Sequence, residues 1–278
     1  MIRLTRRRTG SAVPQSFRAN GLMAKSQKLV DIYYAALSSG QERQFSSAEW
    51  KPAKIALKTD TAGKCAYCEA PTNTVAHGDV EHFRPKSVYW WLAFCFDNYL
   101  FSCQICNQSH KGDKFPVSGQ QLGSIPMPPN RPQGAALNQL VASLTLDASA
   151  INDAHITNLW GGENADLVHP YFEDPAPLFT YEPDVANEEM WVRSAGGARA
   201  DRAMAASNSC LGINRPELRS ARYTHYLMMV VLKTVLDQPQ PAAVKDIATA
   251  QVKRLQESRS PFAGMQRWFA LQWNLPPP

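Results

Sequence analysis

The sequence lacks both a long apolar run and an apolar leader. No uninterrupted apolar stretch approaches the roughly 18 residues that a membrane-spanning helix needs, and the longest candidate, YLMMVVLKTVL, is broken by Lys233. The opening segment, MIRLTRRRTG, is charged and no apolar segment follows it, which argues against a secretory signal. We therefore expect a cytoplasmic protein that makes no contact with a membrane.

The sequence also lacks a strong charge of either sign. It contains 29 Lys and Arg residues against 24 Asp and Glu residues, a formal net charge of +5. This mild excess is compatible with a nucleic-acid partner and does not establish one. Four arginines near the start allow two interpretations, a solvated, frayed terminus or a flexible arm that contacts phosphate: Arg3, Arg6, Arg7 and Arg8.

Cysteine is scarce, and its spacing is informative. Four of the six cysteines form two C-x-x-C pairs, in KCAYCEA and SCQICNQ. Without a secretory signal, such pairs indicate a metal site rather than disulfides. Two C-x-x-C turns complete a tetrahedral zinc site with no open position, so we predict a structural Zn²⁺ bound by Cys65, Cys68, Cys103 and Cys106. Chance spacing and a redox motif are the alternatives, and no thioredoxin-like βαβ pattern supports the second.

The rest of the chain is dominated by helical periodicity. At 278 residues, 44% of them hydrophobic, it is long enough for one large domain or two modest ones. We predict helices at residues 21–37, 47–58, 198–211, 216–237 and 241–258. Residues 123–134 are rich in proline and glycine and indicate an exposed connection, and 140–195 look irregular with short strands. We expect the apolar face of the helices at 216–258 to be core, with a partner surface as the alternative.

A second set of residues lies between and just after the cysteine pairs. DVEHFRPK places Glu81 beside His82, FDNYLFSC contains Asn98, and CNQSHKGDKFP contains Asn107 and Lys111. This order resembles the HNH (ββα-metal) endonucleases, in particular the branch with the pattern CxYCE…EHFRPK…N-L…C-x-x-CN…KG…FP. That branch is found in bacterial Septu and retron anti-phage systems, next to an SMC-like ATPase. The strong similarity covers residues 63–117, about a fifth of the chain.

The resemblance implies an α+β fold, with a zinc-knuckle-braced ββα-metal (HNH) core wrapped by N- and C-terminal α-helices. We divide the chain accordingly. Residues 1–62 are a basic arm and helices that pack on the core, 63–117 are the nuclease core, and 118–278 are an irregular connection followed by a helical region. We expect these parts to fold as one continuous unit.

The resemblance also implies catalytic roles. His82 corresponds to the general base, and Asn98 to the residue that braces the loop and orients that histidine. Glu81 and Asn107 correspond to protein ligands of the catalytic divalent ion. Many HNH enzymes have Asp where this chain has Glu81, which leaves open whether Glu81 binds the ion directly.

The chemistry of phosphodiester hydrolysis requires residues of these types. A neutral imidazole with a pKa of about 6.5 can take a proton from water near pH 7. Mg²⁺ or Mn²⁺, held by a carboxylate and an amide oxygen, can polarise the phosphate. Adjacent side chains on a regular strand point to opposite faces, so we expect the strand to end or bend at Glu81–His82, helped by Pro85.

Basic residues around this motif are candidate phosphate contacts. We assign Arg84, Lys86 and Lys111 to substrate binding, with ordinary surface charge as the alternative for each. His77 and His110 are not expected to bind metal, because the four cysteines already complete the zinc site.

The resemblance therefore implies a metal-dependent endonuclease of phage defence. Its expected substrate is nucleic acid, with DNA first and RNA or tRNA as open alternatives. The expected partners are an SMC-like ATPase and, in retron systems, a reverse transcriptase with its nucleic acid. The competing hypothesis is a catalytically inactive, zinc-stabilised binding or adaptor module. The intact set of Glu81, His82, Asn98 and Asn107 favours the enzyme, because an adaptor has no need of it.

Overall fold

The computed structural model describes residues 1–72 and 78–278, and this part of the chain is a mixed α+β structure. Two separate antiparallel strand pairs are surrounded by helices. The α+β class expected from the sequence is confirmed. His77, which we expected not to bind metal, lies outside the described residues.

The first strand pair is followed by a short helix. β1 (Asp79–His82) pairs with β2 (Tyr99–Ser102), and a π-helix, η7 (Ile105–Lys111), begins shortly after β2. Four helices lie around this unit: α1 (Ala19–Ser39), α2 (Lys54–Asp60), α3 (Gly134–Ser143) and α4 (Asp153–Trp160). Leu57 of α2 shares a buried apolar cluster with Phe101 of β2, so α2 covers one side of the strand pair.

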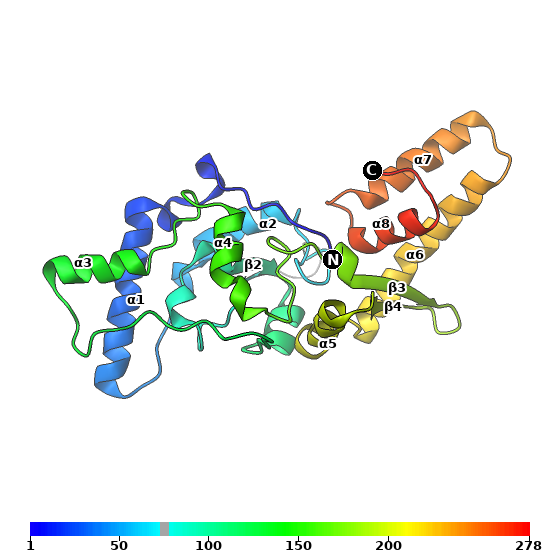
Figure 1. Cartoon of the computed structure of the whole chain (residues 1–278). Coiled ribbons are helices and arrows are strands. Elements are labelled where there is room, and N and C mark those ends of the chain that lie inside the picture. The colour runs from blue at the N-terminus through cyan, green and yellow to red at the C-terminus, as the bar shows by residue number, and fades with distance from the viewer. Residues whose placement is uncertain (73–77) are drawn as a thin grey trace.

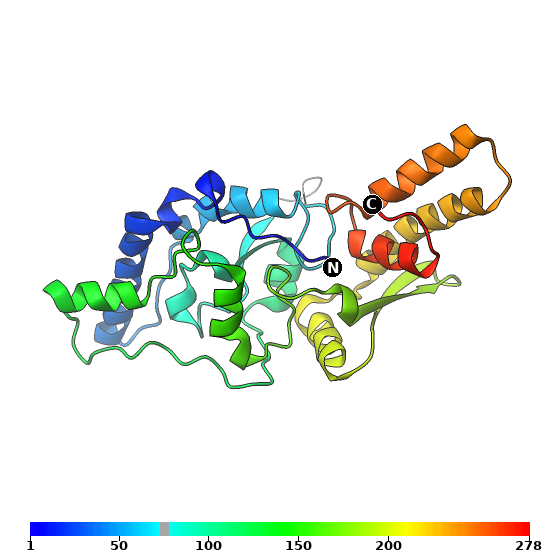
Figure 2. The same ribbon diagram turned by 45° about the horizontal axis from the view of Figure 1, so that its top comes forward.

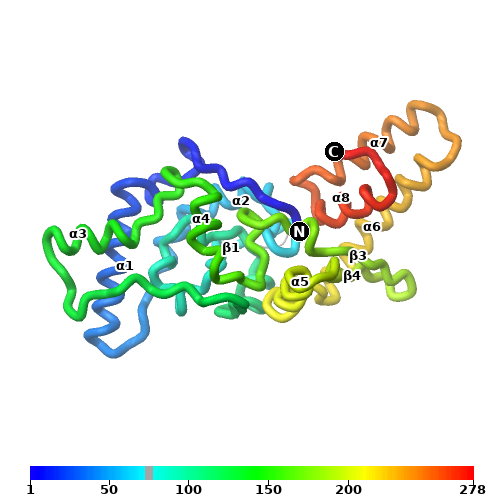
Figure 3. Tube along the Cα trace, viewed as in Figure 1, coloured from blue at the N-terminus to red at the C-terminus, as the bar shows by residue number. Residues whose placement is uncertain are grey.

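The second strand pair organises the C-terminal half. β3 (Phe179–Asp184) and β4 (Glu189–Ser194) form a hairpin. Four helices follow: α5 (Ala198–Leu211), α6 (Pro216–Asp237), α7 (Ala242–Gln256) and α8 (Ala263–Gln272). Figure 1 and Figure 2 both show α6 and α7 side by side, extending away from the rest of the molecule. The trace in Figure 3 then returns through α8 towards β3.

One hydrophobic cluster joins the two halves of the elongated molecule. It includes Leu100 of β2, Met190 of β4 and Phe269 of α8, all buried. Helix α5 also packs directly against η7. Contact of this kind makes burial in one half depend on the other. Among the residues that the structure describes, no helix is long and apolar enough to cross a bilayer.

The predicted helices agree with the structure at most positions, and the exceptions have physical causes. Helices α1, α5, α6 and α7 match the predicted ranges. The helix predicted at 47–58 is divided into two 3₁₀ turns and α2, because Pro52 has no backbone N–H to donate. Residues 140–195 are more regular than expected, since they contain the end of α3, all of α4 and the β3–β4 hairpin.

The apolar face of α6 is only partly core. Met229 is fully buried, whereas Leu227, Met228 and Val231 are 44%, 40% and 61% exposed. The expectation of core therefore holds for one side of the helix and is wrong for these three side chains.

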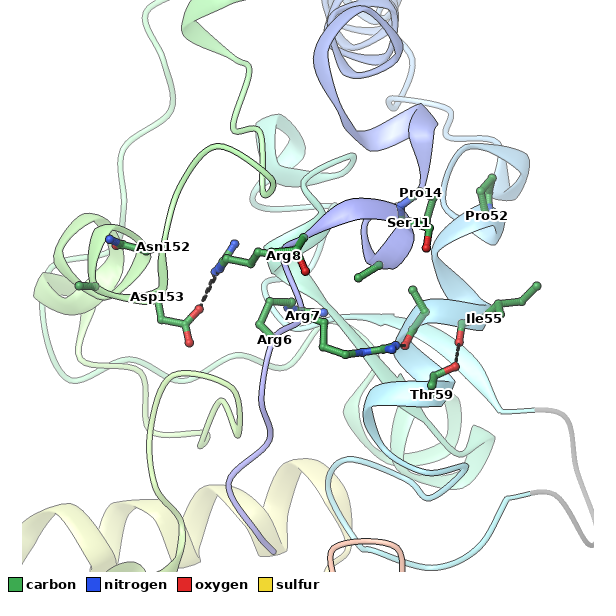
Figure 4. Close-up of a pocket in the computed structure, with 14 residues that line it drawn as sticks. Arg6, Arg7, Arg8, Ser11, Pro14, Pro52, Ile55, Thr59, Asn152 and Asp153 are labelled. Carbon is green, nitrogen blue, oxygen red and sulfur yellow. Dashed lines mark hydrogen bonds and ion pairs between the residues drawn. The ribbon is translucent and has the colours of Figure 1, made fainter.

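Three of the four N-terminal arginines, Arg6, Arg7 and Arg8, are neither frayed nor part of a flexible phosphate-binding arm. Arg6 is buried, and its guanidinium lies 3.6 Å from the centroid of the Tyr171 ring. Arg8 forms ion pairs with Asp97 and Asp153, as Figure 4 shows for Asp153. Both interpretations offered by the sequence are wrong for these residues, because carboxylates distant in the sequence already neutralise them.

Burial of a histidine makes the fold sensitive to acid. His169 is buried against Phe83 and Phe172, and burial, reinforced by Arg6 and Arg84, holds its pKa well below the ordinary value of 6.5. The unfolded chain takes up a proton near pH 6.5 and the folded chain does not. Stability is therefore lost as pH falls below 6.5, by up to about 2 kcal/mol from this residue between pH 6.5 and 5.

We expect His169→Phe to weaken this acid dependence, because phenylalanine suits the aromatic surroundings and binds no proton. Urea unfolding at several pH values between 7 and 5 measures the effect. Some dependence should remain, since burial also lowers the pKa of His82 and His225. His155→Phe, at an exposed position, is the control. An unchanged pH dependence in His169→Phe would show that this histidine does not contribute.

Candidate functional site

The two C-x-x-C pairs meet in space. Their four Sγ atoms all lie within 4.8 Å of one another, and all four cysteines are free thiols: Cys65, Cys68, Cys103 and Cys106. The first pair lies on a turn that is fixed to β2, because the N–H of Ala66 donates to the carbonyl of Phe101 at 2.9 Å. The second pair lies at the start of η7, where the N–H of Cys106 donates to Cys103 Sγ at 3.4 Å.

This thiol cluster suits a zinc ion. Four sulfurs at about 2.3 Å from one ion lie roughly 3.8 Å apart in a tetrahedron, and the observed spread is compatible with that arrangement. Arg215 donates from Nη1 to Cys106 Sγ at 3.5 Å and supplies positive charge next to the thiolates. Because all four positions are filled by sulfur, a metal here would be structural rather than catalytic.

Metal analysis tests the cluster directly. We expect purified protein to carry about one zinc ion per chain and Cys106→Ser to lose most of it. Zinc binding contributes folding free energy, on the order of 10 kcal/mol in small zinc modules, so the variant should also unfold at a lower temperature. Metal content and thermal unfolding are measured together. Cys95→Ala, at a buried thiol outside the cluster, should keep its zinc. Full zinc content in Cys106→Ser would rule out the site.

Three of the four predicted catalytic residues line one cavity. Glu81, His82 and Asn107 surround a space of about 430 Å³ next to the thiol cluster. β1 ends at His82, as expected from the acid–histidine pair, and both of its last residues face the cavity. Asn107 reaches it from η7, directly after Cys106. The spacing of the second C-x-x-C pair therefore places this amide opposite the end of β1.

Asn98 lies behind the cavity rather than in it. It is fully buried, and its Oδ1 accepts from the N–H of Arg84 at 2.8 Å while its Nδ2 donates to the carbonyl of Arg84 at 3.0 Å. The carbonyl of Asn98 also accepts from the N–H of Phe83 at 2.8 Å. These bonds hold the chain that leaves β1. The expected bracing role of Asn98 is compatible with this geometry, and it acts on His82 through the backbone.

The imidazole of His82 is fixed in one orientation. Its Nε2 lies 2.9 Å from the carbonyl oxygen of Ala93, which only accepts, so Nε2 carries the proton and Nδ1 keeps a lone pair. The rings of Trp50 and Tyr99 meet it edge to face at 4.9 and 5.0 Å. Burial lowers the pKa of His82 to about 3, against the opposing effect of the Ala93 hydrogen bond. The ring is therefore neutral at physiological pH.

Glu81 is held by a buried ion pair. Lys111 Nζ lies 2.6 Å from Glu81 Oε1 and donates to the carbonyl of His82 at 3.0 Å. Burial raises the pKa of Glu81 to about 7, while Lys111 acts in the opposite direction. Lys111 is 1% exposed. Its ammonium group positions Glu81 and the end of β1, which argues against the phosphate contact expected for it.

Arg84 does not line the cavity either. It is buried, its Nε lies 2.6 Å from Glu163 Oε2, and its guanidinium is 4.4 Å from the ring centroid of Trp160. The acidic partner argues against a role in binding phosphate. Lys86 does line the cavity, with its Nζ 5.6 Å from the ring centroid of Trp50.

Sequence reasoning missed several residues of the cavity. Trp50, Lys51 and Lys54 form its wall on the segment that leads into α2. The basic spacing in EWKPAKIALK was the available signal, and it was interpreted only as helix. Tyr67, whose hydroxyl lies 3.5 Å from Glu81 Oε1, was also missed.

A larger cavity is lined by arginines that are already paired with acidic residues. It measures about 990 Å³ and is lined by Arg6, Arg7 and Arg8, whose arrangement is shown in Figure 4. All three arginines form ion pairs with aspartates. Because its positive charge is already neutralised, this cavity is a weaker candidate than the one at His82.

Comparison with known proteins gives a partial similarity. The chain is 37% identical over 89 residues to Septu protein PtuB of Bacillus mycoides (strain KBAB4). The aligned region covers 27% of this chain and 30% of that protein, so the similarity spans less than a third of either. No protein-family model and no solved structure matches.

Proposed function

We propose that the chain is a metal-dependent HNH endonuclease of anti-phage defence. β1, β2 and η7 would form its ββα-metal core, and the reaction is hydrolysis of phosphodiester bonds in nucleic acid. The observation that carries this proposal is the presence of Glu81, His82 and Asn107 around one cavity. The partial similarity to Septu protein PtuB supports the defence role. We propose an SMC-like ATPase as the partner.

The residues present suit a hard divalent ion. Glu81 offers a carboxylate and Asn107 an amide oxygen, both typical ligands of Mg²⁺ and Mn²⁺. The cavity of about 430 Å³ exceeds by far the roughly 30 Å³ that one water occupies, so it has room for water and phosphate together. A bound ion would polarise the phosphate and neutralise developing charge.

His82 has the geometry of a general base. Its Nδ1 lone pair would take the proton from the water that attacks phosphorus. The Nε2–H bond to the Ala93 carbonyl keeps the tautomer and strengthens as the ring gains charge. Asn98 keeps this end of β1 in place through its two bonds to Arg84.

Cleavage assays test the assignment of the base. With Mg²⁺ or Mn²⁺, the parent protein should cut nucleic acid, and His82→Ala should reduce the rate at least about 100-fold. DNA and RNA substrates, including tRNA, are compared side by side. EDTA should stop the reaction. His155→Ala, at an exposed position, is the control. If His82→Ala cuts as fast as the parent, His82 is not the base.

The ion pair at Glu81 favours a second candidate function. In this structure Lys111 already neutralises the carboxylate that would hold the catalytic ion. A catalytically inactive, zinc-stabilised module that only binds nucleic acid or a protein partner would not need to free the Glu81 carboxylate from Lys111. Binding without cleavage at every metal condition would identify this alternative.

A further inference from the structure

We propose that the lysines of the segment 51–58 form a track that binds the phosphate backbone of the substrate strand next to the His82 cavity. The lysine track consists of Lys51, Lys54 and Lys58, with Lys86 facing it. This inference rests on the proposed nuclease function and adds where the strand lies. None of Lys51, Lys54 and Lys58 belongs to the motif that resembles HNH enzymes.

The track runs from the cavity outward along α2. Lys51 and Lys54 line the cavity together with His82. Lys58 follows Lys54 after one helical turn on the same face of α2, so the two lie roughly 6 Å apart along the axis. Long, flexible lysine side chains at this spacing can contact successive phosphates of one strand.

The charge of the track is not neutralised inside the protein. Among the residues that the structure describes, five lysines form ion pairs with carboxylates: Lys25, Lys28, Lys64, Lys111 and Lys233. The lysines of the track and Lys86 are not among them. Lys51 and Lys58 are exposed and Lys54 is half-buried. They differ in this respect from Arg6, Arg7 and Arg8, which all have acidic partners.

The acidic and the basic residues that line the cavity lie on different parts of its wall. Of its acidic residues, Asp79 and Glu81 come from β1, and Asp113 comes from the turn that follows η7. Lys51 and Lys54 come from the segment that begins α2. Lys86 follows β1 in the chain, but its ammonium group lies towards the α2 segment, 5.6 Å from the ring centroid of Trp50. A site that holds a cation on one side and a phosphate backbone on the other needs this separation.

Salt-dependent binding tests the track without requiring cleavage. In a His82→Ala background with EDTA present, we compare Lys54→Ala/Lys58→Ala with Lys245→Ala/Lys253→Ala. Both pairs remove the same charge from a helix, and each pair contains one half-buried and one exposed lysine. The probes are fluorescent single-stranded and duplex oligonucleotides of DNA and RNA at several salt concentrations.

The proposal expects the Lys54→Ala/Lys58→Ala variant to bind more weakly and to lower the log–log salt slope by about 1.4–1.8, since each of the two lost phosphate contacts removes roughly 0.7–0.9. Lys54→Arg/Lys58→Arg should restore the slope, and the Lys245→Ala/Lys253→Ala control should leave it unchanged. Equal salt slopes in the two double-alanine variants would overturn the proposed lysine track. Loss of cutting in His82→Ala would still support the nuclease function in that case. A parent protein that neither binds nor cuts any probe overturns both proposals.

Discussion

Four cysteine sulfurs have to meet at one point before the rest of this site can exist. The first pair is attached to β2 by the Ala66–Phe101 hydrogen bond, and the second pair begins η7. Bringing them within 4.8 Å fixes η7 against the strand pair, and Asn107 then comes to the cavity because it directly follows Cys106. Arg215 and the packing of α5 on η7 connect the same point to the C-terminal half.

Buried polar contacts, as well as apolar packing, hold the side chains around the cavity in place. Two buried ion pairs, Lys111–Glu81 and Arg84–Glu163, hold the residue before His82 and the residue two positions after it. Burying charges costs nearly as much free energy as their attraction returns, so such pairs contribute little net stability while they specify a geometry. The neutral imidazole of His82 between them keeps a fixed tautomer. The protein's own contacts therefore set the positions of the groups around the cavity.

The sequence predicts local chemistry well and long-range partners poorly. Cys65, Cys68, Cys103 and Cys106 could be grouped because a C-x-x-C turn has few uses. Glu81, His82 and Asn107, which the motif order singled out, line one cavity, and their catalytic role stays a prediction. Helices α1, α5, α6 and α7 followed from periodicity. Arg84 looked like a surface cation because its partner, Glu163, is 79 residues away, and no local pattern connects them.

Two of the helices that the sequence did not predict, α4 and α3, have a local explanation. α4 begins after Asn152, whose side chain accepts from the N–H of His155, a capping signal in a segment too short and polar to show periodicity. α3 begins just after a proline-rich connection, which masks its start. Conversely, Pro52 removed the continuity that the pattern at 47–58 suggested.

The ion pair between Arg8 and Asp153 joins positions 145 residues apart. Ribosomes add roughly 5–20 residues per second, so a nascent chain exposes Arg8 on the order of ten seconds before Asp153 has even been made. Loop closure of this length is entropically costly. Asp60 and Asp97 are made earlier and can already pair with Arg7 and Arg8, so the N-terminal segment gains its last acidic partner only after more than half of the polypeptide has been synthesised.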